Sequence, residues 1–191
     1  MSTYATNLSH QALVANRVEL VEFGDFVCPK SRAIRKALTT SLALFTGYVH
    51  YTYRHYPNPA CEPSLLAAYA AEAAREQDKF WSMYNALFLQ PTINQPLVSI
   101  LAIYLGLDHH QFQQDLTNAS IRARIDADRW EGEQLGIHST PALLINGHVI
   151  HGKLTQARLI PLLRHYIDRT EVPILSTVDR VRGMVHWNDG E

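Results

Sequence analysis

The chain has 191 residues, of which 47% are hydrophobic and 18% are charged, and its formal net charge is −1. This length fits one domain with insertions better than two domains, and the apolar content is sufficient for a folded core. The near-zero charge gives no reason to expect nucleic acid or an anionic membrane as the partner. Residues 1–17 lack the pattern of a secretory signal, and no stretch approaches the ~20 apolar residues that span a bilayer.

The chain has only two cysteines, Cys28 and Cys61. They can pair once, but they cannot form the framework of a disulfide scaffold. A reducing cytoplasm is therefore the expected location, where cysteines tend to be chemical rather than structural. The histidines show no metal-ligand spacing, and neither a phosphate-binding glycine loop nor a serine nucleophile elbow is present, so no metal or bound cofactor is expected.

The first elements in chain order predict a βαβ unit. Residues 18–23 alternate between polar and apolar side chains and indicate a strand, which the connector 24–27 follows. Pro29 stands where a helix begins, and good helix formers continue to Leu42. Residues 48–56 are rich in Tyr, Val and Thr and predict a second strand, which is expected to be parallel to the first.

A helical block and a hairpin follow. Helical spacing, caps and stops predict helices over residues 64–75, 79–89, 97–105, 108–116 and 118–135. Residues 142–145 predict a strand, Asn146-Gly147 a tight hairpin turn and 148–150 the returning strand. A last helix is expected over 155–168, and the tail after Thr170 has no assignment. The fold class is therefore α/β, a small mixed sheet interrupted by one helical insertion.

Cys28 is the first candidate for chemistry, because it directly precedes Pro29 at the start of a helix. The free amides and dipole of the first turn would stabilise a thiolate, which is the reactive form of cysteine. Lys30 and Arg32 add positive charge nearby and are expected to point to solvent. The Ser31 hydroxyl is expected to donate a hydrogen bond to the sulfur. Taken alone, a cysteine that merely caps a helix is the commoner case.

Two further features add to this site. Glu22 stands in an apolar strand beside Leu20 and Phe23, so it is either a buried carboxylate with a proton-handling role or a glutamate facing solvent from an edge strand. Thr140-Pro141 stands directly before the third predicted strand. A cis peptide there would expose the Thr140 backbone for pairing with an extended peptide, although a trans proline opening a strand is more common.

Together these features resemble the DsbA-type thiol–disulfide oxidoreductases, in order from about Val18 to Asp168. The segments that carry the resemblance are Val21–Pro29, Tyr53–Pro57, Ala67–Ala74, Gln77–Tyr84, Gly136–Pro141 and Asn146-Gly147. The resemblance implies a thioredoxin-like fold (βαβ … ββα) with an inserted helical domain at about 63–135. The domain itself would cover 18–168, between an N-terminal extension of 1–17 and a tail of 169–191.

The resemblance also implies roles for individual residues. Cys28 takes the place of the nucleophile, Glu22 that of the buried acid and Pro141 that of the cis-proline. The departure is Ser31 in the motif Cys28-Pro29-Lys30-Ser31, where the family normally has a resolving cysteine. Without that sulfur a mixed disulfide persists until another thiol attacks it. The expected activity is therefore that of a monothiol oxidoreductase or disulfide isomerase. It would act on protein or peptide thiols and disulfides or on small thiols, with glutathione as a candidate co-substrate.

Three alternatives remain open at this point. Cys61 is either a remote resolving thiol or, as its unremarkable surroundings favour, an unreactive loop thiol. The protein as a whole is either an exchange enzyme or a binding module that keeps the cis-proline groove for an extended partner. A glutathione transferase of the kappa type ranks last, because in that class a serine replaces the first cysteine of the motif and not the second.

Overall fold

The computed structural model describes residues 17–169, which group into two compact units. The first unit comprises residues 17–22, 34–52 and 143–169, and the second comprises 23–33 and 53–142. The predicted N-terminal extension up to residue 16 and the predicted tail beyond Arg169 lie outside the described residues, so their assignment stays a prediction.

Four strands form one mixed sheet, as predicted, in the order β2-β1-β3-β4. They are β1 (Val18–Gly24), β2 (Val49–His55), β3 (Ala142–Ile145) and β4 (His148–Val149). The Val18 amide donates to the Tyr48 carbonyl at the start of β1, and the Tyr56 amide donates to the Gly24 carbonyl at its end. Both strands thus run in the same direction, which agrees with the parallel βαβ unit expected from the sequence.

The predicted hairpin at Asn146-Gly147 is confirmed. Ile145 pairs with His148 across a two-residue loop, and both loop residues have positive φ, 48° for Asn146 and 78° for Gly147. This is the conformation that matches the twist of the two strands. Asn146 also fixes β3 to β1, because its amide donates to the Glu19 carbonyl (2.9 Å) and its Oδ1 accepts from the Glu19 amide (2.8 Å).

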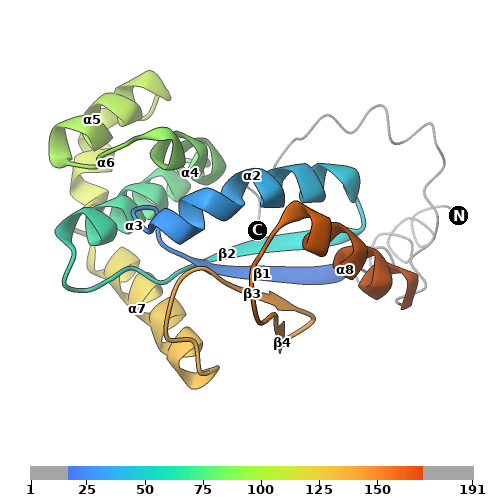
Figure 1. The fold of residues 1–191 in the computed structure, drawn as a ribbon. Helices are drawn as coiled ribbons and strands as arrows, with labels where there is room; N and C mark the ends of the chain where they lie inside the picture. The colour runs from blue at the N-terminus through green and yellow to red at the C-terminus, as the bar shows by residue number, and fades with distance from the viewer. Residues whose placement is uncertain (1–16, 170–191) are drawn as a thin grey trace, which may run out of the picture. The chain divides into compact units, whose positions relative to one another are not determined.

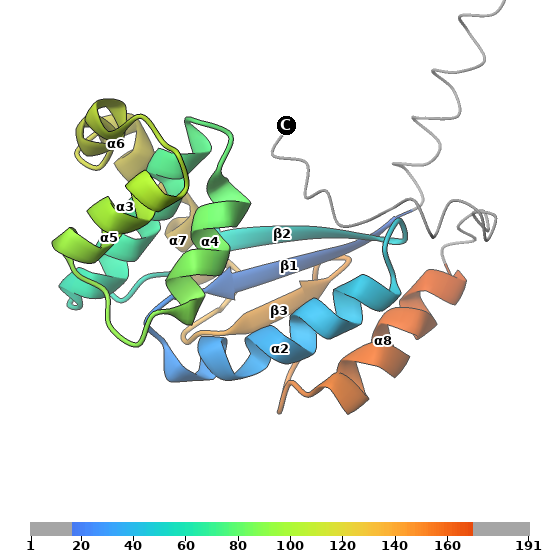
Figure 2. The same cartoon turned by 90° about the horizontal axis from the view of Figure 1, so that it is seen from above.

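Two helices cover one face of the sheet in the first unit: α2 (Pro29–Leu44), of which residues 34–44 belong to this unit, and α8 (Gln156–Arg169). Figures 1 and 2 show them side by side along the sheet. Their buried side chains pack with those of β1 and β3 in one core: Val18, Leu20, Ile34, Leu38, Leu42, Leu143, Ile145, Leu159 and Leu163. Alternation along β1 places Glu22 on the same face as Val18 and Leu20, which is why this carboxylate is buried.

The second unit contains the helical insertion, whose core is built from alanines and aromatic rings. Its helices are α3 (Glu62–Arg75), α4 (Phe80–Leu89), α5 (Gln95–Tyr104), α6 (His109–Asp115) and α7 (Ala119–Gln134). The small side chains of α3 at Ala67, Ala70, Ala71 and Ala74 are fully buried. They leave room for an aromatic cluster formed by Phe26, Tyr53, Phe80, Tyr84 and Phe88.

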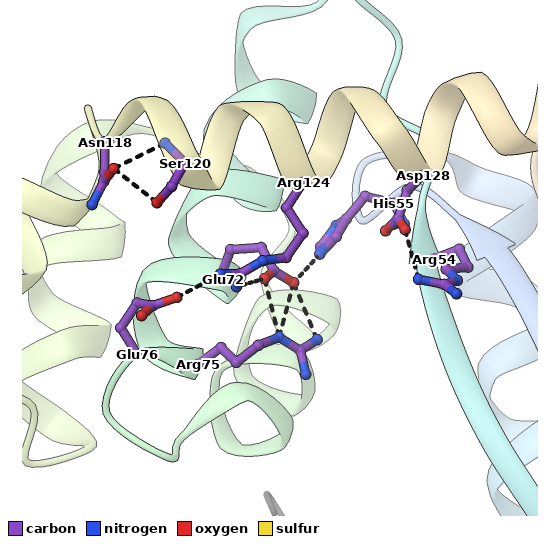
Figure 3. Close-up of polar contacts among 9 residues, drawn as sticks. All are labelled: Arg54, His55, Glu72, Arg75, Glu76, Asn118, Ser120, Arg124 and Asp128. Carbon is purple, nitrogen blue, oxygen red and sulfur yellow. Dashed lines mark hydrogen bonds and ion pairs between the residues drawn. The ribbon is translucent and has the colours of Figure 1, made fainter. Parts of the chain in front are cut away.

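A buried ion network joins the end of β2 to α3 and α7 within this unit (Figure 3). His55 Nε2 lies 2.8 Å from Glu72 Oε1, and both side chains are almost completely buried. Arg75 Nε and Arg124 bind Glu72 Oε2 at 3.0 and 2.6 Å. Burial alone would raise the pKa of Glu72, but the hydrogen bond and charge of His55 and the charge of Arg75 outweigh it and hold the pKa well below its usual range.

A second carboxylate in this network fixes the backbone of β2. Asp128 Oδ2 accepts a hydrogen bond from the His55 amide (2.9 Å), and its Oδ1 accepts one from Arg54 (3.0 Å). Burial raises the pKa of Asp128, against the opposing effects of the His55 amide and the Arg54 charge. α7 is thereby held to β2 at the point where the chain leaves the sheet for Tyr56.

We expect Glu72→Gln to destabilise the protein by about 3 kcal/mol at pH 7, because removing one partner of a buried network leaves the others uncompensated. The pKa of Glu72 is lower in the folded than in the unfolded chain, so its contribution is complete above about pH 4.5 and declines as the pH falls. Denaturant unfolding should show the difference from wild type shrinking by about 1 kcal/mol at pH 3.5.

The matched control is Glu133→Gln, which removes a surface pair with Arg129 and should change stability by less than ~1 kcal/mol. A deficit for Glu72→Gln that is equally large at both pH values would contradict the ionic role of this carboxylate.

Candidate active site at the start of helix α2

A tight turn presents Cys28 directly before the first residue of α2. The Cys28 amide donates to the Asp25 carbonyl (3.1 Å), and Asp25 Oδ1 accepts from the Val27 amide (2.9 Å). The Arg32 amide then donates to the Cys28 carbonyl (3.1 Å), which is the first hydrogen bond of the helix. Cys28 is therefore the N-cap, as the sequence predicted, and Pro29 occupies the position where a missing amide proton costs nothing.

The start of helix α2 favours a negative charge on the Cys28 sulfur. Cys28 is half-buried, and the first turn of α2 carries no acidic residue that would offset the positive end of the helix dipole. Lys30 is exposed, as expected. These features favour the thiolate, which is the nucleophilic form.

The loop that contains Pro141 places a hydrogen-bond acceptor beside the Cys28 sulfur. The Thr140-Pro141 peptide bond is cis, and Cys28 Sγ donates a hydrogen bond to the Thr140 carbonyl oxygen at 3.4 Å. A carbonyl oxygen accepts from the protonated thiol and has nothing to donate to a thiolate. The structure thus brings together Cys28, Thr140 and Pro141, which are far apart in the sequence, and the sulfur lies between helix amides and one carbonyl.

Tyr56 holds the loop that carries the cis-proline in place. Its hydroxyl donates to the Ile137 carbonyl (2.7 Å), and its ring meets the edge of Phe23 with centroids 6.4 Å apart. Gly132 of α7 lies against the same ring, where an added Cβ would be only 2.8 Å from Tyr56 Cε2. The position therefore requires glycine, because any side chain would displace the tyrosine that holds the loop.

The structure corrects the expected role of Ser31. Its hydroxyl is completely buried and accepts a hydrogen bond from the Asp25 amide at 3.4 Å. No hydrogen bond from Ser31 to the Cys28 sulfur is present among the described residues. The side chain therefore stabilises the turn that precedes the cysteine, and it provides no second sulfur.

Arg32 is a second correction, because it does not point to solvent. Its Nε donates to the Phe26 carbonyl (2.7 Å), and its NH1 donates to the Gln90 carbonyl at the end of α4. No pattern in the sequence indicates these contacts, since an arginine on the first turn of a helix ordinarily extends into water. The guanidinium instead curls back over the turn that carries Cys28.

Glu22 belongs to the first unit and has its own buried surroundings. It is fully buried, its Oε2 accepts a hydrogen bond from the Tyr51 hydroxyl, and its Oε1 has no partner among residues 17–169. Burial raises the pKa of Glu22 to about 7, although the Tyr51 hydrogen bond and the charge of Arg35 act in the opposite direction. Of the two interpretations of this residue, the structure has the buried carboxyl and not the one that faces solvent.

Cys61 also caps a helix, at the start of α3. It is half-buried, its side chain makes no capping hydrogen bond, and neither it nor Cys28 is in a disulfide. Its part as a resolving thiol stays a prediction. Within residues 17–169, no group of three or more His, Cys, Asp or Glu side chains is arranged to hold a metal ion. None of the helices in that range is long and apolar enough to cross a membrane.

Comparison with known proteins identifies the fold. A family model described as thioredoxin matches residues 14–165. A thioredoxin-like oxidoreductase from Silicibacter pomeroyi DSS-3 is 28% identical and superposes with a TM-score of 0.70, covering 82% of this chain and 88% of that one. BdbD from Bacillus subtilis has the same fold, with 22% identity, a TM-score of 0.70 and coverage of 81% and 89%.

The curated relatives are much longer proteins. A protein named Na(+)/H(+) antiporter NhaA 1 from Mycolicibacterium gilvum is 32% identical over 148 residues, and its namesake from Mycolicibacterium vanbaalenii is 34% identical over 148 residues. Each match covers 75% of this chain but only 24% of the relative. The chain therefore spans about a quarter of the length of these relatives.

We expect Glu22→Gln to remove a pH dependence of stability. Between about pH 4.5 and 7 the folded protein holds the Glu22 proton and the unfolded chain does not, so wild-type stability falls as the pH rises. The loss is on the order of 3 kcal/mol. Glutamine still accepts from Tyr51 but cannot ionise. Denaturant unfolding at pH 5 and pH 8 should therefore show that the free energy of unfolding of the variant, relative to wild type, is higher at pH 8 than at pH 5.

Glu19→Gln is the matched control, because Glu19 lies on the same strand with its side chain exposed. It should follow the wild-type pH dependence. If Glu22→Gln follows it as well, the Glu22 carboxyl does not titrate in this range.

Proposed function

The chain belongs to the thioredoxin family, and from this premise we propose that it is a DsbA-like thiol–disulfide oxidoreductase. It would exchange thiols and disulfides through the single cysteine Cys28. One observation carries the proposal. The Cys28 sulfur is half-buried at the N-cap of α2 and in hydrogen-bond contact with the Thr140 carbonyl beside the cis peptide bond. A helix N-terminus favours the nucleophilic thiolate.

The chemistry that follows from one sulfur is a two-step exchange. The Cys28 thiolate attacks a disulfide, one new S–S bond forms to Cys28, and the other sulfur leaves as a thiolate that takes up a proton. Ser31 cannot attack this mixed disulfide. A second, external thiol must do so, which restores Cys28 and carries away the bound group as a new disulfide. Glutathione in a reducing cytoplasm would suit this second step.

We expect oxidised glutathione to convert the protein into a mixed disulfide on Cys28. The reason is the thiolate favoured by the helix, together with the lack of a neighbouring thiol to release the adduct. Intact-mass measurement after incubation at pH 6.5 should show one added glutathionyl group. Reduced glutathione should then remove this group.

Three variants show which cysteine carries the adduct and whether a neighbouring thiol releases it. Cys61→Ser should still form the adduct, and Cys28→Ser should not. Ser31→Cys places a thiol at a buried position in the same helix turn, so its adduct should be replaced by an internal disulfide that lacks two hydrogens. A Cys28 that stays unmodified while the protein is folded would contradict the proposal and favour a binding module. An adduct on Cys61 alone would contradict it as well.

The curated relatives favour a more specific setting, an association with a membrane antiporter. In those proteins the segment that matches this chain is part of one polypeptide named as a Na(+)/H(+) antiporter. Joining two modules covalently raises the effective concentration of each near the other, which is useful where they act together. We infer that this chain acts on, or docks to, an antiporter of that kind.

A binding measurement tests this setting. The Mycolicibacterium gilvum antiporter, without the segment that matches this chain, would be purified in detergent and titrated with the full chain. Saturable binding in the micromolar range is expected, and it should be absent for an unrelated membrane protein in the same detergent. Equal signals for both membrane proteins, or none for either, would contradict the association without affecting the glutathione result.

A further inference from the structure

Arg32 makes two contacts that join distant parts of the second unit. Through Nε it binds the Phe26 carbonyl, two residues before Cys28, at 2.7 Å, and through NH1 it binds the Gln90 carbonyl. Both acceptors are backbone oxygens, so the contacts depend on the geometry of the chain and not on the identity of neighbouring side chains. The planar guanidinium can satisfy both at once because its donors diverge in a fixed fork.

The Gln90 carbonyl is available because of the way α4 ends. Gln90 is the C-cap of α4, with φ −85° and ψ 134°, and its amide donates to the Leu87 carbonyl. Pro91 follows, and a residue before proline is pushed into this extended conformation. The extended backbone turns the Gln90 carbonyl out of the helix direction. It therefore meets the Arg32 guanidinium, where a positive charge also complements the negative end of the α4 dipole.

We propose that Arg32 is a positioning residue for Cys28, which clamps the turn before the cysteine to the end of α4 and fixes a permanent positive charge on that turn. The inference rests on the proposed reactivity of Cys28 and goes beyond it. Ser31 and Asp25 hold the turn through one neutral hydrogen bond of 3.4 Å, which is long. The contact from Arg32 to Phe26 is shorter and charge-assisted, so it is a stronger restraint than the Ser31 contact. It adds to the two hydrogen bonds that Asp25 accepts from the amides of Val27 and Cys28.

The proposal assigns this fixed charge an effect on the sulfur, in a site that also holds the buried Asp25 side chain and the exposed Lys30. The Thr140 carbonyl accepts from the Cys28 thiol and so opposes ionisation. A guanidinium held on the same turn acts in the opposite direction, because an opposite charge nearby favours the ionised form. Lysine in place of arginine would keep the charge, but its single ammonium cannot span two carbonyls in a fixed plane.

The test is the pH dependence of alkylation of Cys28 by iodoacetamide, measured by intact mass in a Cys61→Ser background. For Arg32→Gln we expect the midpoint of the pH profile to rise by about one unit. At a pH far above the midpoint, its rate should stay within about twofold of the parent, because only ionisation changes. Arg32→Lys should move the midpoint by less than Arg32→Gln. Lys36→Gln, an exposed charge on the next turn of α2, is the matched control and should not move it.

The outcomes separate three cases. A raised midpoint for Arg32→Gln with an unmoved Lys36→Gln supports the proposal. A lower melting temperature with an unmoved midpoint would show that Arg32 has a structural role only, and the proposal would be wrong. If the Cys61→Ser parent itself does not react with iodoacetamide or oxidised glutathione, the proposed function fails first, and the positioning role fails with it.

Discussion

The contact between the Cys28 sulfur and the Thr140 carbonyl is the interaction on which the proposed chemistry depends. It joins residues 112 positions apart in the sequence, and the rest of the second unit holds them there. Tyr56 fixes the loop through Ile137, and Gly132 makes room for Tyr56. Arg32 and Ser31 fix the turn at Cys28.

The ion network around Glu72 and Asp128 holds α7 to the end of β2, directly before Tyr56. Stability of the helical insertion and geometry of the sulfur are thus parts of one arrangement.

Two features of the Cys28 site act on the sulfur in opposite directions. The first turn of α2 favours the thiolate, whereas the Thr140 carbonyl accepts a proton from the thiol. A protein with a resolving cysteine can discharge a mixed disulfide internally, so strong activation is safe for it. With Ser31 at that position, an adduct formed on Cys28 in the proposed exchange cannot be released within the motif.

Most of the fold was predictable because its signals are local. Alternation in residues 18–23, the Asn146-Gly147 turn and proline at the first position of α2 each specify conformation within a few residues. The position of Cys28 at the N-cap followed from Pro29 for the same reason. The partners of side chains were not predictable in this way. Arg32 curls back onto Phe26 and Gln90, and Ser31 faces Asp25 instead of the sulfur, because tertiary neighbours decide between orientations that the local sequence leaves equal.

The partners of the buried carboxylates could also not be predicted from the sequence, because they come from distant segments. A glutamate within the alanine run of α3 was a signal that Glu72 would need partners, but His55 and Arg124 come from separate segments, and no spacing rule connects them.

Glu72 and Glu22 show two solutions to the burial of a carboxyl group. Glu72 is surrounded by His55 and two arginines, which hold its pKa low, so it stays ionised and serves stability. Glu22 receives one hydroxyl hydrogen bond from Tyr51 and the favourable charge of Arg35, but burial outweighs both and raises its pKa to about 7. A carboxyl that gains and loses a proton near neutral pH reduces stability at higher pH. Burial of Glu22 therefore lowers the stability as the pH rises past neutral, whereas the ionised Glu72 does not have this effect.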